Sequence, residues 1–418
     1  MNYPQALHFL DSFLNLEKLS QFPQNPFFNL ERMNHLLRIG GHPEKNFLAI
    51  LIAGTTGKGS TGFFLESILR ANKIPVGYYH SPHIEDVRER IRLEGRPVSK
   101  KIWAKELSNI KALLLKRPLP KKLGTLTYFE ILTFLAVLIF AKTNRRIGIF
   151  EVGLGGRLDA TNILKAPLTI LTPIHLDHEH FLGDTIGKIA KEKAAIIKKN
   201  CQIVTAPQCP EALSVIKQSV RKNQARLWRA KLLTNTKIAL CGEFQKINAG
   251  TAMKAAEIFR SEFEAPIRKE NYSKAFQMKD WKGRMERFRR SGHEYILDGA
   301  HNLISVKSLI KSSAKGRSPW LIFGAMRDKN SGAMLKMLAR HFDRIILTGI
   351  KNNRAKTAGE LLRESKSLFK CALLAQNIEE AIRTMELVSE ANASVVVTGS
   401  FYLVGEARKI LTNKNRFF

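Results

Sequence analysis

Residues 47–72 read FLAILIAGTTGKGSTGFFLESILRAN: an apolar run, a Gly-rich turn and then a helical pattern. The run from Phe47 to Ala53 has the length of a buried strand. In the turn, residues 54–60, glycines let backbone N–H groups crowd a polyphosphate, and the helix N-terminus adds a partial positive charge. Lys58 supplies a full charge and a hydroxyl can face a metal ion, so the turn predicts a phosphate-binding loop. An extra Gly before Ser60 departs from the GxxxxGK(S/T) spacing, and a simple tight connection is the alternative.

Apolar runs of strand length recur along the chain and alternate with helical patterns, which is typical of a parallel sheet covered by helices. We expect an α/β fold with an N-terminal P-loop-containing ATPase domain, residues 1–286, whose sheet is mostly parallel. We expect a smaller Rossmann-like α/β domain over residues 287–418, with the domain boundary within a basic, turn-rich stretch from Lys279 to Arg290. The expected strands are Phe47–Ala53, Ile147–Val152, Leu168–Ile174, Tyr295–Leu297, Trp320–Phe323, Arg344–Leu347 and Ser394–Val397.

Composition excludes several classes of protein. The 418 residues carry 68 Lys and Arg against 36 Asp and Glu, a formal charge of +32, and 44% are apolar, which excludes wholesale disorder. The longest apolar run, Ile131 to Ala141, is well below the roughly 18 residues that span a bilayer. The first residues fit neither a secretory signal nor a transit peptide, so we expect a cytoplasmic protein. Four cysteines without a CxxC spacing indicate neither a disulfide framework nor a thiolate zinc site.

A second polar cluster follows the strand that ends near residue 152. It reads EVGLGGRLDATN over residues 151–162. The Glu151 carboxylate, at a strand end beside three glycines, suits Mg²⁺, which prefers hard oxygen ligands and keeps several waters. The GxGG element also suggests an oxidoreductase with a dinucleotide-binding fold, but it lacks the GxGxxG spacing. A plain glycine turn with a solvated Glu remains a further alternative.

The third cluster, HLDHEH at residues 175–180, follows the strand that begins at Leu168. Three His and two carboxylates could hold zinc, but such sites usually draw another ligand from elsewhere and no HExxH motif is present. Beside a phosphate-binding loop, one or two ligands for a magnesium nucleotide are the better interpretation, with His180 facing solvent.

Lys193 is distinguished by its position on a helical stripe. Beginning near Asp184, the apolar positions are Ile186, Ile189 and Ala190, then Lys193, then Ile197. A lysine on an inward stripe must extend its ammonium to solvent, pair, or be modified, because a lone buried ammonium is costly. Burial lowers a lysine pKa and makes the amine reactive toward carbon dioxide, but periodicity alone favours extension to solvent. The neighbouring Lys188, Lys191 and Lys198 fall off the stripe and are expected on a solvated face.

In the second half, polar groups again follow predicted strands. Asp298-Gly299-Ala300-His301-Asn302 and Thr398-Gly399-Ser400 both stand at strand ends, where a ligand can bind, although ordinary turn chemistry explains either alone.

These motifs, in this order and over nearly the whole chain, resemble the folylpolyglutamate synthase and dihydrofolate synthase branch of the Mur ligase superfamily. The matching segments are GTTGKGS (54–60), SPHIEDVRERI (81–91), TYFE (127–130), EVGLGGRLDATN (151–162), LDHEHFLG (176–183), EKAAI (192–196), GRMERF (283–288), LDGAHN (297–302) and TGSFYLVGE (398–406).

The resemblance implies an ATP-dependent ligase that activates a folate carboxylate as an acyl phosphate and joins it to L-glutamate, giving ADP and phosphate. It implies two Mg²⁺ ions and a carbamylated Lys193 in place of a solvent-seeking lysine. Residues implied to bind ATP are Gly57, Lys58, Gly59, Ser60, Asn248, Arg284 and Asp298. Implied magnesium ligands are Ser81, Glu151 and His178. Positions implied to hold glutamate or act in catalysis are His301 and Ser400, with Lys58 and Lys193. Implied pterin-pocket positions are Phe28, Asn29, Leu30, Glu31, Arg32, Thr127, Leu158, Asp159 and Ala160.

Three departures from the family pattern are visible. Thr56 stands where the family usually has Asn, and Ala195 replaces a usual Gly. Residues 27–29 lack the Asp and Gly of some bifunctional relatives, which bears on dihydropteroate as a substrate more than on polyglutamylation. Expected partners are the small molecules ATP, L-glutamate and folate or dihydropteroate, with no membrane and a monomeric chain. Two rivals remain: a Mur-type ligase with another acid or amino acid, and a nucleic-acid-stimulated NTPase, which the large charge suggests but its spread along the chain disfavours.

Overall fold

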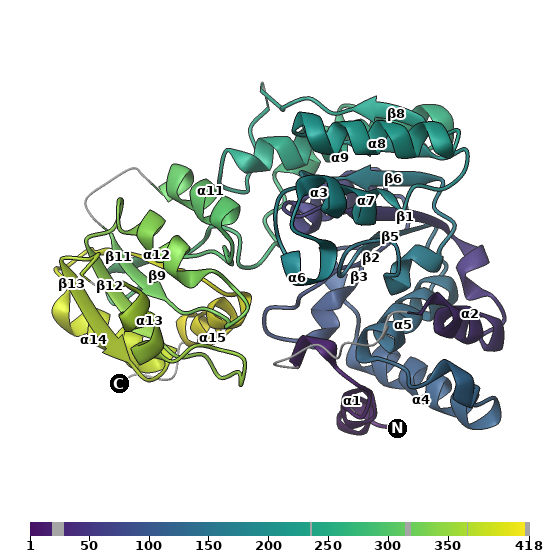
Figure 1. Cartoon of the computed structure of the whole chain (residues 1–418). Helices are drawn as coiled ribbons and strands as arrows, with labels where there is room; N and C mark the ends of the chain where they lie inside the picture. The colour runs from purple at the N-terminus through teal and green to yellow at the C-terminus, as the bar shows by residue number, and fades with distance from the viewer. Residues whose placement is uncertain (19–28, 235, 314–318, 366, 414–418) are drawn as a thin grey trace. The chain divides into compact units, whose positions relative to one another are not determined.

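The computed structural model describes residues 1–18, 29–234, 236–313, 319–365 and 367–413. The chain divides into two compact units, coloured purple to green and green to yellow in Figure 1. Unit 1 comprises Met1–Ser81, Arg88–Ala239 and Gln245–Lys279. Unit 2 comprises Asp280–Phe418 with two short earlier segments, Pro82–Val87 and Leu240–Phe244.

Unit 1 is built on an eight-stranded sheet of order β4-β3-β2-β5-β1-β6-β7-β8. The six neighbouring strands β2, β5, β1, β6, β7 and β8 run parallel, and β3 and β4 add an antiparallel edge. The strands are β1 Leu48–Ala53, β2 Val76–Tyr79, β3 Ile91–Leu93, β4 Arg96–Pro97, β5 Ile147–Glu151, β6 Leu168–Leu171, β7 Gln202–Thr205 and β8 Arg226–Arg229. The central strands are continuous apolar runs because helices cover both of their faces.

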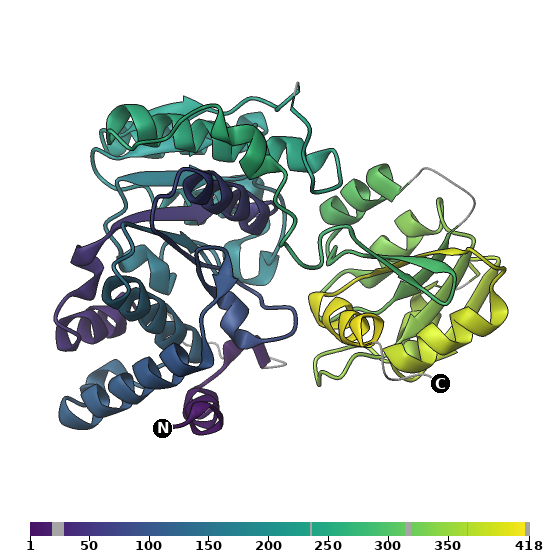
Figure 2. The same ribbon diagram turned by 180° about the vertical axis from the view of Figure 1, so that it is seen from behind.

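Helices of unit 1 cover both faces of this sheet. Figure 2 shows α3 and α9 on the face turned toward the viewer, and Figure 1 shows α7 and α8 on the other. The helices are α1 Tyr3–Asp11, α2 Leu30–Ile39, α3 Lys58–Ala71, α4 Lys100–Lys116, α5 Tyr128–Lys142, α6 Glu179–Leu182, α7 Ile186–Ala194, α8 Pro210–Lys222, α9 Phe244–Glu262 and α10 Asn271–Phe276. Short 3-10 helices are η1 Leu16–Lys18, η2 Pro43–Asn46, η3 Val87–Arg90, η4 Lys121–Leu123 and η5 Ala160–Ile163.

The most apolar helix, α5, is buried on almost every side. Its N-terminus is closed by a capping box in which Thr127 and Glu130 satisfy each other's backbone N–H groups. Among the described residues, no helix is long and apolar enough to cross a membrane.

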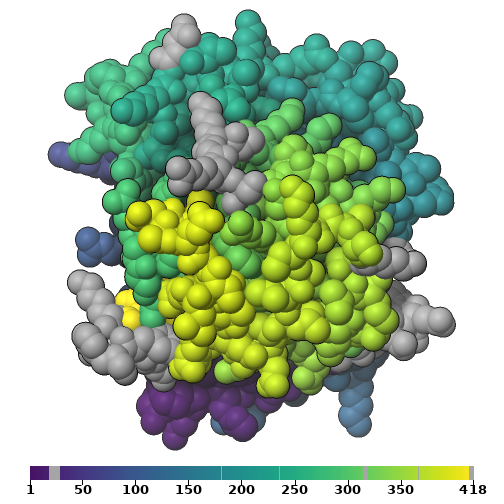
Figure 3. All heavy atoms as spheres, turned by 90° about the vertical axis from the view of Figure 1, so that its left-hand side faces the viewer, coloured from purple at the N-terminus to yellow at the C-terminus, as the bar shows by residue number. Residues whose placement is uncertain are grey.

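Unit 2 is a six-stranded sheet of order β13-β12-β11-β14-β10-β9, parallel except for β9. Alternate residues of its strands face two hydrophobic cores: Ile296 packs with α11 and α12, while Tyr295 and Leu297 pack with α14 and α15. In Figure 3 the C-terminal part of this unit, coloured yellow, lies on the face turned toward the viewer. The strands are β9 Glu286–Arg290, β10 His293–Leu297, β11 Trp320–Phe323, β12 Arg344–Thr348, β13 Cys371–Ala375 and β14 Ser394–Thr398. The helices are α11 Leu303–Ser313, α12 Ser331–Leu338, α13 Ala358–Ser365, α14 Ile378–Val388 and α15 Phe401–Thr412.

The fold class is as predicted, an α/β protein with two mostly parallel sheets, but the stretch 279–290 differs from its turn-rich prediction. Residues 286–290 form β9, which pairs antiparallel with β10 through a turn at Ser291 and Gly292. The predicted division after residue 286 would cut this strand, whereas the main body of unit 2 begins at Asp280.

A buried ion pair ties α3 to the antiparallel edge of unit 1. Arg92 Nε donates to Glu66 Oε2 at 3.0 Å, and both side chains are almost fully buried. Glu66 Oε1 also accepts from Gly95 N at 3.0 Å, and Arg92 Nη2 donates to Gly95 O at 2.6 Å. Each charge is therefore paired and hydrogen-bonded, which a buried ion requires.

Glu66→Ala should lower the free energy of unfolding by about 3–5 kcal/mol, because it leaves the Arg92 guanidinium buried without its carboxylate. Urea denaturation followed by circular dichroism measures the change. The matched control is Asp184→Ala, which removes an exposed pair with Lys188 and should leave the midpoint unmoved. Equal midpoints for the two variants would contradict a stabilising role for the buried pair.

Candidate functional site

Four parallel strands of unit 1, in the order β2-β5-β1-β6, end at one edge of the sheet. Ile52 of β1 pairs with Glu151 of β5, and Ala53 pairs with Leu171 of β6. The loops that leave these strands contain Ser81, the phosphate-binding loop, the 151–162 cluster and the 175–180 cluster. Because parallel strands end together, the topology gathers these segments at the edge where open α/β sheets bind ligands.

Two glycines fix the shape of the phosphate-binding loop. Gly54 has a φ of 151° and Gly57 a φ of 83°, a region that side chains rarely adopt. A Cβ at Gly54 would collide with Oγ1 of Thr172, and one at Gly57 with Oδ1 of Asn248. Helix α3 begins directly after Gly57, and Ser60 in its first turn is buried. The predicted ATP-binding residues of unit 1, Asn248 included, are therefore adjacent.

Lys58 and Glu151 are connected through the backbone of this loop and Tyr78. Lys58 Nζ donates to Gly54 O at 3.1 Å. The hydroxyl of Tyr78 donates to Gly59 O at 3.1 Å and is 3.4 Å from Glu151 Oε2. Burial and the Glu151 carboxylate raise the pKa of Tyr78, which keeps it a donor. Sequence reasoning missed Tyr78 because the short run VGYY of β2 was not recognised as a strand.

Lys193 is buried, with only 6% of its surface exposed, so it does not extend its ammonium to solvent. Burial, and then the charge of Lys58, lower its pKa from 10.5 to about 7, while Asp177 and Asp159 act in the opposite direction. A neutral amine is therefore available near physiological pH. Lys193 also lies beside the 151–162 cluster, because a Cβ at Gly156 would be 3.1 Å from Cα of Lys193.

Two details of the predicted lysine stripe are wrong. Helix α7 ends at Ala194, so Ile197 lies beyond it. Lys198 is only partly exposed: its Nζ donates to both O and Oδ1 of Asn162 at 2.6 Å, and burial lowers its pKa to about 8. Periodicity could not reveal this because the partner, Asn162, comes from another part of the chain.

The 175–180 cluster is only partly buried. His178 is exposed and has a left-handed φ of 52°, and its N–H donates to Asp177 Oδ1 at 3.0 Å. His175 is held against the phosphate-binding loop, since its N–H donates to Thr55 Oγ1 at 3.0 Å. Within the described ranges, no group of three or more His, Cys, Asp and Glu is arranged to hold a metal, so the zinc alternative gains no support.

The predicted pterin-pocket residues lie on elements that meet. Helix α2, which begins after Asn29, contacts both α5 and η5. Thr127 and Ala160 stand at the start of α5 and η5, and both are buried. Leu158 is half-buried and Leu30 opens α2, whereas Phe28 lies outside the described residues.

Asp159 has a structural task within its loop. Its Oδ2 accepts from the N–H groups of Gly153 and Leu154, and its Oδ1 accepts from N and Oγ1 of Thr161. The carboxylate thus folds the 151–162 cluster into shape and caps η5. Helix α2 is fixed similarly, since Arg32 Nε donates to Glu130 Oε1 at 2.8 Å in a buried pair.

The predicted residues of unit 2 gather around one aromatic ring that the sequence did not single out. The Arg284 guanidinium lies 4.3 Å above the ring of Phe401, and the His301 ring is 5.3 Å from it. Ser400 precedes Phe401 and caps α15, and a Cβ at Gly299 would collide with the same ring. An aromatic residue directly after a strand-end Gly-Ser is the signal that could have identified it.

Asp298 is buried in this second cluster. Its Oδ2 accepts from Met285 N at 3.0 Å and its Oδ1 from Ala300 N at 2.9 Å. Burial raises its pKa from 3.8 to about 6, although Arg284 and the two N–H groups oppose the change. The His301 Nδ1 is 2.8 Å from Gly299 O. A carbonyl only accepts, so Nδ1 carries a proton and Nε2 is the acceptor nitrogen of the neutral ring.

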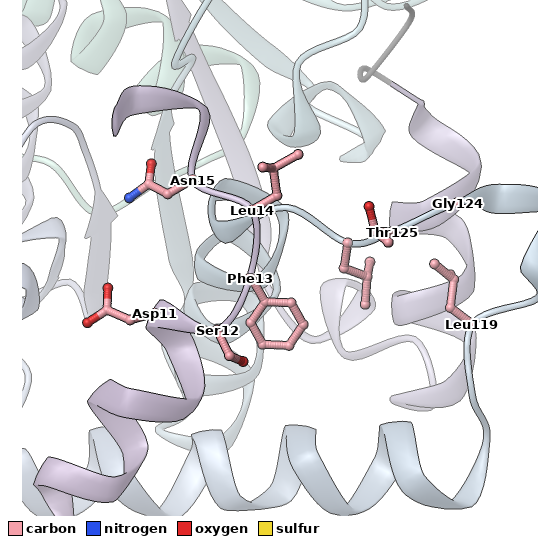
Figure 4. Close-up of a pocket in the computed structure, with 9 residues that line it drawn as sticks. Asp11, Ser12, Phe13, Leu14, Asn15, Leu119, Gly124 and Thr125 are labelled. Atoms are coloured by element: carbon pink, nitrogen blue, oxygen red, sulfur yellow. The ribbon is translucent and has the colours of Figure 1, made fainter. Parts of the chain in front are cut away.

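A separate pocket of about 700 Å³ lies between segments 11–15 and 119–126 of unit 1. Figure 4 shows the ring of Phe13 and the side chain of Leu119 on opposite sides of it. None of the predicted site residues lines this pocket, although Leu14 forms a bridge with Thr127.

Known proteins resemble this chain in both sequence and fold. Residues 283–401 match the family described as Mur ligase, glutamate ligase domain. The dihydrofolate synthase/folylpolyglutamate synthase of Bacillus subtilis is 33% identical over 410 residues, 91% of this chain and 94% of that protein. A folylpolyglutamate synthase of Mycobacterium tuberculosis complexed with ADP has a TM-score of 0.88 at 26% identity, over 99% and 98% of the two chains. FolC of Escherichia coli in complex with DHPP and ADP has a TM-score of 0.83 at 26% identity, over 98% and 97%. The chain therefore belongs to the folylpolyglutamate synthase/dihydrofolate synthase family of the Mur ligases, as its motifs predicted.

Proposed function

We propose that this chain is an ATP-dependent amide ligase that joins L-glutamate to folates through an acyl phosphate, and that it also accepts dihydropteroate. The observation that carries the proposal is the convergence of a glycine-shaped loop, Lys58, Glu151 and Lys193 at one edge of the unit 1 sheet. A relative bound to AMPPCP and folate, and one bound to DHPP and ADP, support both substrate classes.

Charge neutralisation is the main task of the site. A folate carboxylate that attacks the γ-phosphate of ATP brings two anions together, so positive groups must offset the developing charge. Lys58 is at the first position of α3 and uses one of its three N–H donors on Gly54 O. The other two donors can bind phosphate oxygens, together with the N–H groups at the start of α3.

Magnesium fits the donor set at this edge. Ser81 and Glu151 offer a hydroxyl and a carboxylate, the hard oxygen ligands that Mg²⁺ prefers, and His178 would complete the protein ligands. Mg²⁺ usually keeps waters and phosphate oxygens as its other ligands, which agrees with so sparse a set of protein groups. When bound, the ions would supply charge neutralisation on the phosphates.

Lys193 suits carbamylation. Its amine is neutral above a pKa of about 7, and only the neutral amine attacks carbon dioxide. The product is an anion, so its formation would turn the repulsion from Lys58 into an attraction. We propose that the resulting carbamate supports the second magnesium ion.

Unit 2 is proposed to contact ATP through Arg284 and Asp298 and to hold glutamate through His301 and Ser400. With Nδ1 fixed on Gly299 O, His301 presents Nε2 as a proton acceptor. Glutamate must lose a proton from its ammonium group before the amine attacks the acyl phosphate, and a neutral imidazole suits that transfer. The amine then displaces phosphate to leave the amide.

Phosphate release from ATP is the direct test of the proposed reaction. Purified protein should release phosphate with tetrahydrofolate plus glutamate and with dihydropteroate plus glutamate, and neither acid should support release when another amino acid replaces glutamate. Release with tetrahydrofolate alone would restrict the enzyme to polyglutamylation, as the departure at residues 27–29 suggests. The absence of phosphate release with both folates would contradict the proposal, and so would phosphate release that added RNA stimulates when no folate is present.

Lys193→Ala should lower kcat by about a hundredfold, the size expected for losing one charge-stabilising group, and a short carboxylic acid should restore part of it. In buffer stripped of carbon dioxide the parent enzyme should lose activity, and added bicarbonate should restore it more fully at pH 8 than at pH 6. That sign follows because the amine is protonated and unreactive below a pKa of about 7.

The control for this substitution is Lys191→Ala, which removes an exposed lysine of the same helix and should leave turnover unchanged. A Lys193→Ala enzyme with full turnover, or a parent indifferent to bicarbonate, would exclude the carbamate.

A further inference from the structure

The net charge of +32 exceeds what ATP, folate and glutamate require, and the sequence spreads it over the whole chain. The fold brings part of this positive charge together at one edge of a sheet. In unit 1 six parallel strands lie in the order β2-β5-β1-β6-β7-β8, so the segments that enter them lie side by side at the amino edge of the sheet. This edge is opposite to the one that carries the phosphate-binding loop.

Each of the six entering segments carries at least one exposed basic residue. In the order of the strands they are Lys73, Arg146, Lys45, Lys165, Lys199 and then the pair Arg221 and Lys222, which we call the basic row. Backbone hydrogen bonds connect most of these segments directly. The bonds are Arg146 N to Pro75 O, Leu48 N to Arg146 O, Gln202 N to Pro167 O and Asn200 N to Asn223 O.

The entering segments contribute little opposing charge of their own. Across residues 43–47, 72–75, 143–146, 164–167, 198–201 and 221–226, the only acidic residue is Glu44, and it pairs with His42. Among the described residues, none of the seven side chains of the row forms an ion pair. Two carboxylates from other parts of the chain, Glu94 and Glu262, contact these segments, and both pair with arginines outside the basic row, Arg145 and Arg226. These two arginines are excluded from the row because of that pairing.

Favourable interaction with helix C-termini is the simplest alternative explanation for the row. It applies to Lys73, Arg146, Lys199 and the α8 pair, which end or follow α-helices. It does not apply to Lys45 and Lys165, which lie in or after 3-10 helices of only four residues. Some of the six strands follow an α-helix and others follow a 3-10 helix, yet the basic row continues across all of them. Helix dipoles alone therefore do not explain it.

We propose that the basic row binds the phosphate backbone of a nucleic acid strand, independently of base sequence. Neighbouring strands are about 4.8 Å apart, so six strands place the seven charges along about 24 Å. A line of point charges suits a linear polyanion, and lysine binds phosphate as a point charge. An anionic membrane is the weaker fit, because Leu48 is the only exposed large apolar side chain within the described part of this edge.

The test is fluorescence anisotropy with a labelled 20-nucleotide single-stranded RNA and the full-length chain, titrated over a range of salt concentrations. If four to seven phosphates are contacted, log K should fall with log salt with a slope of about −3 to −5. The triple variant Lys199→Gln, Arg221→Gln, Lys222→Gln should flatten that slope by about 2 and weaken binding at least tenfold at about 0.1 M salt. Ligase turnover should stay unchanged in the variant.

The matched control removes three exposed charges from helix α4, as Lys101→Gln, Lys105→Gln, Lys116→Gln, and none of the three forms an ion pair within the described part of the chain. It should retain the slope and affinity of the parent. Equal weakening in both triple variants would assign binding to bulk charge and overturn the proposal. So would the absence of RNA binding at about 0.1 M salt, or binding to phosphatidylserine vesicles without binding to RNA.

Discussion

The absence of a side chain at Gly57 is the constraint on which the proposed nucleotide site depends. The residue has a left-handed φ, and any Cβ would enter the space of the buried Asn248, whose Nδ2 donates to Gln245 Oε1. Because the turn can be this tight, only residues 54–57 separate the end of β1 from Lys58, the first residue of α3. The positive end of the helix and the lysine are then presented at the same edge as Glu151 and Lys193.

In unit 2 an aromatic ring, and not a tight turn, holds the predicted site residues together. Phe401 lies beside Arg284, His301 and Gly299 at the ends of two neighbouring parallel strands, β10 and β14. The ring thereby holds together residues that are 100 or more positions away from it in the sequence. Each unit thus uses the carboxyl edge of its own parallel sheet, the edge where strand order alone brings loops together.

Sequence reasoning succeeded where a local pattern carries the physical information. Continuous apolar runs identified β1, β5 and β11, because strands buried on both faces must be apolar throughout. The glycine-rich turn at residues 54–60 and the polar clusters were located because they directly follow apolar strands, at the edge where open α/β sheets bind ligands. Their roles in binding phosphate and metal ions stay predictions.

The failures have a common cause, since they concern residues whose state depends on a partner distant in the sequence. β9 reads as a basic turn because only Phe288 among its residues is apolar, and the strand exists through its pairing with β10. Half-exposed β13 was missed for a similar reason. Lys198 binds Asn162, and Tyr78 donates a hydrogen bond to Gly59. The basic row is invisible in sequence, since strand order rather than chain order collects it.

The most direct measurement of the central claim compares ATP binding by Gly57→Ala and Gly41→Ala. Both glycines have positive φ, of 83° and 78°, so both variants meet the same backbone strain, but only at Gly57 does a Cβ collide with a neighbour. Calorimetric titration with MgATP should show at least a hundredfold weaker binding for Gly57→Ala and parental affinity for Gly41→Ala. Parental affinity in Gly57→Ala would contradict the claim that this turn holds the phosphates of ATP.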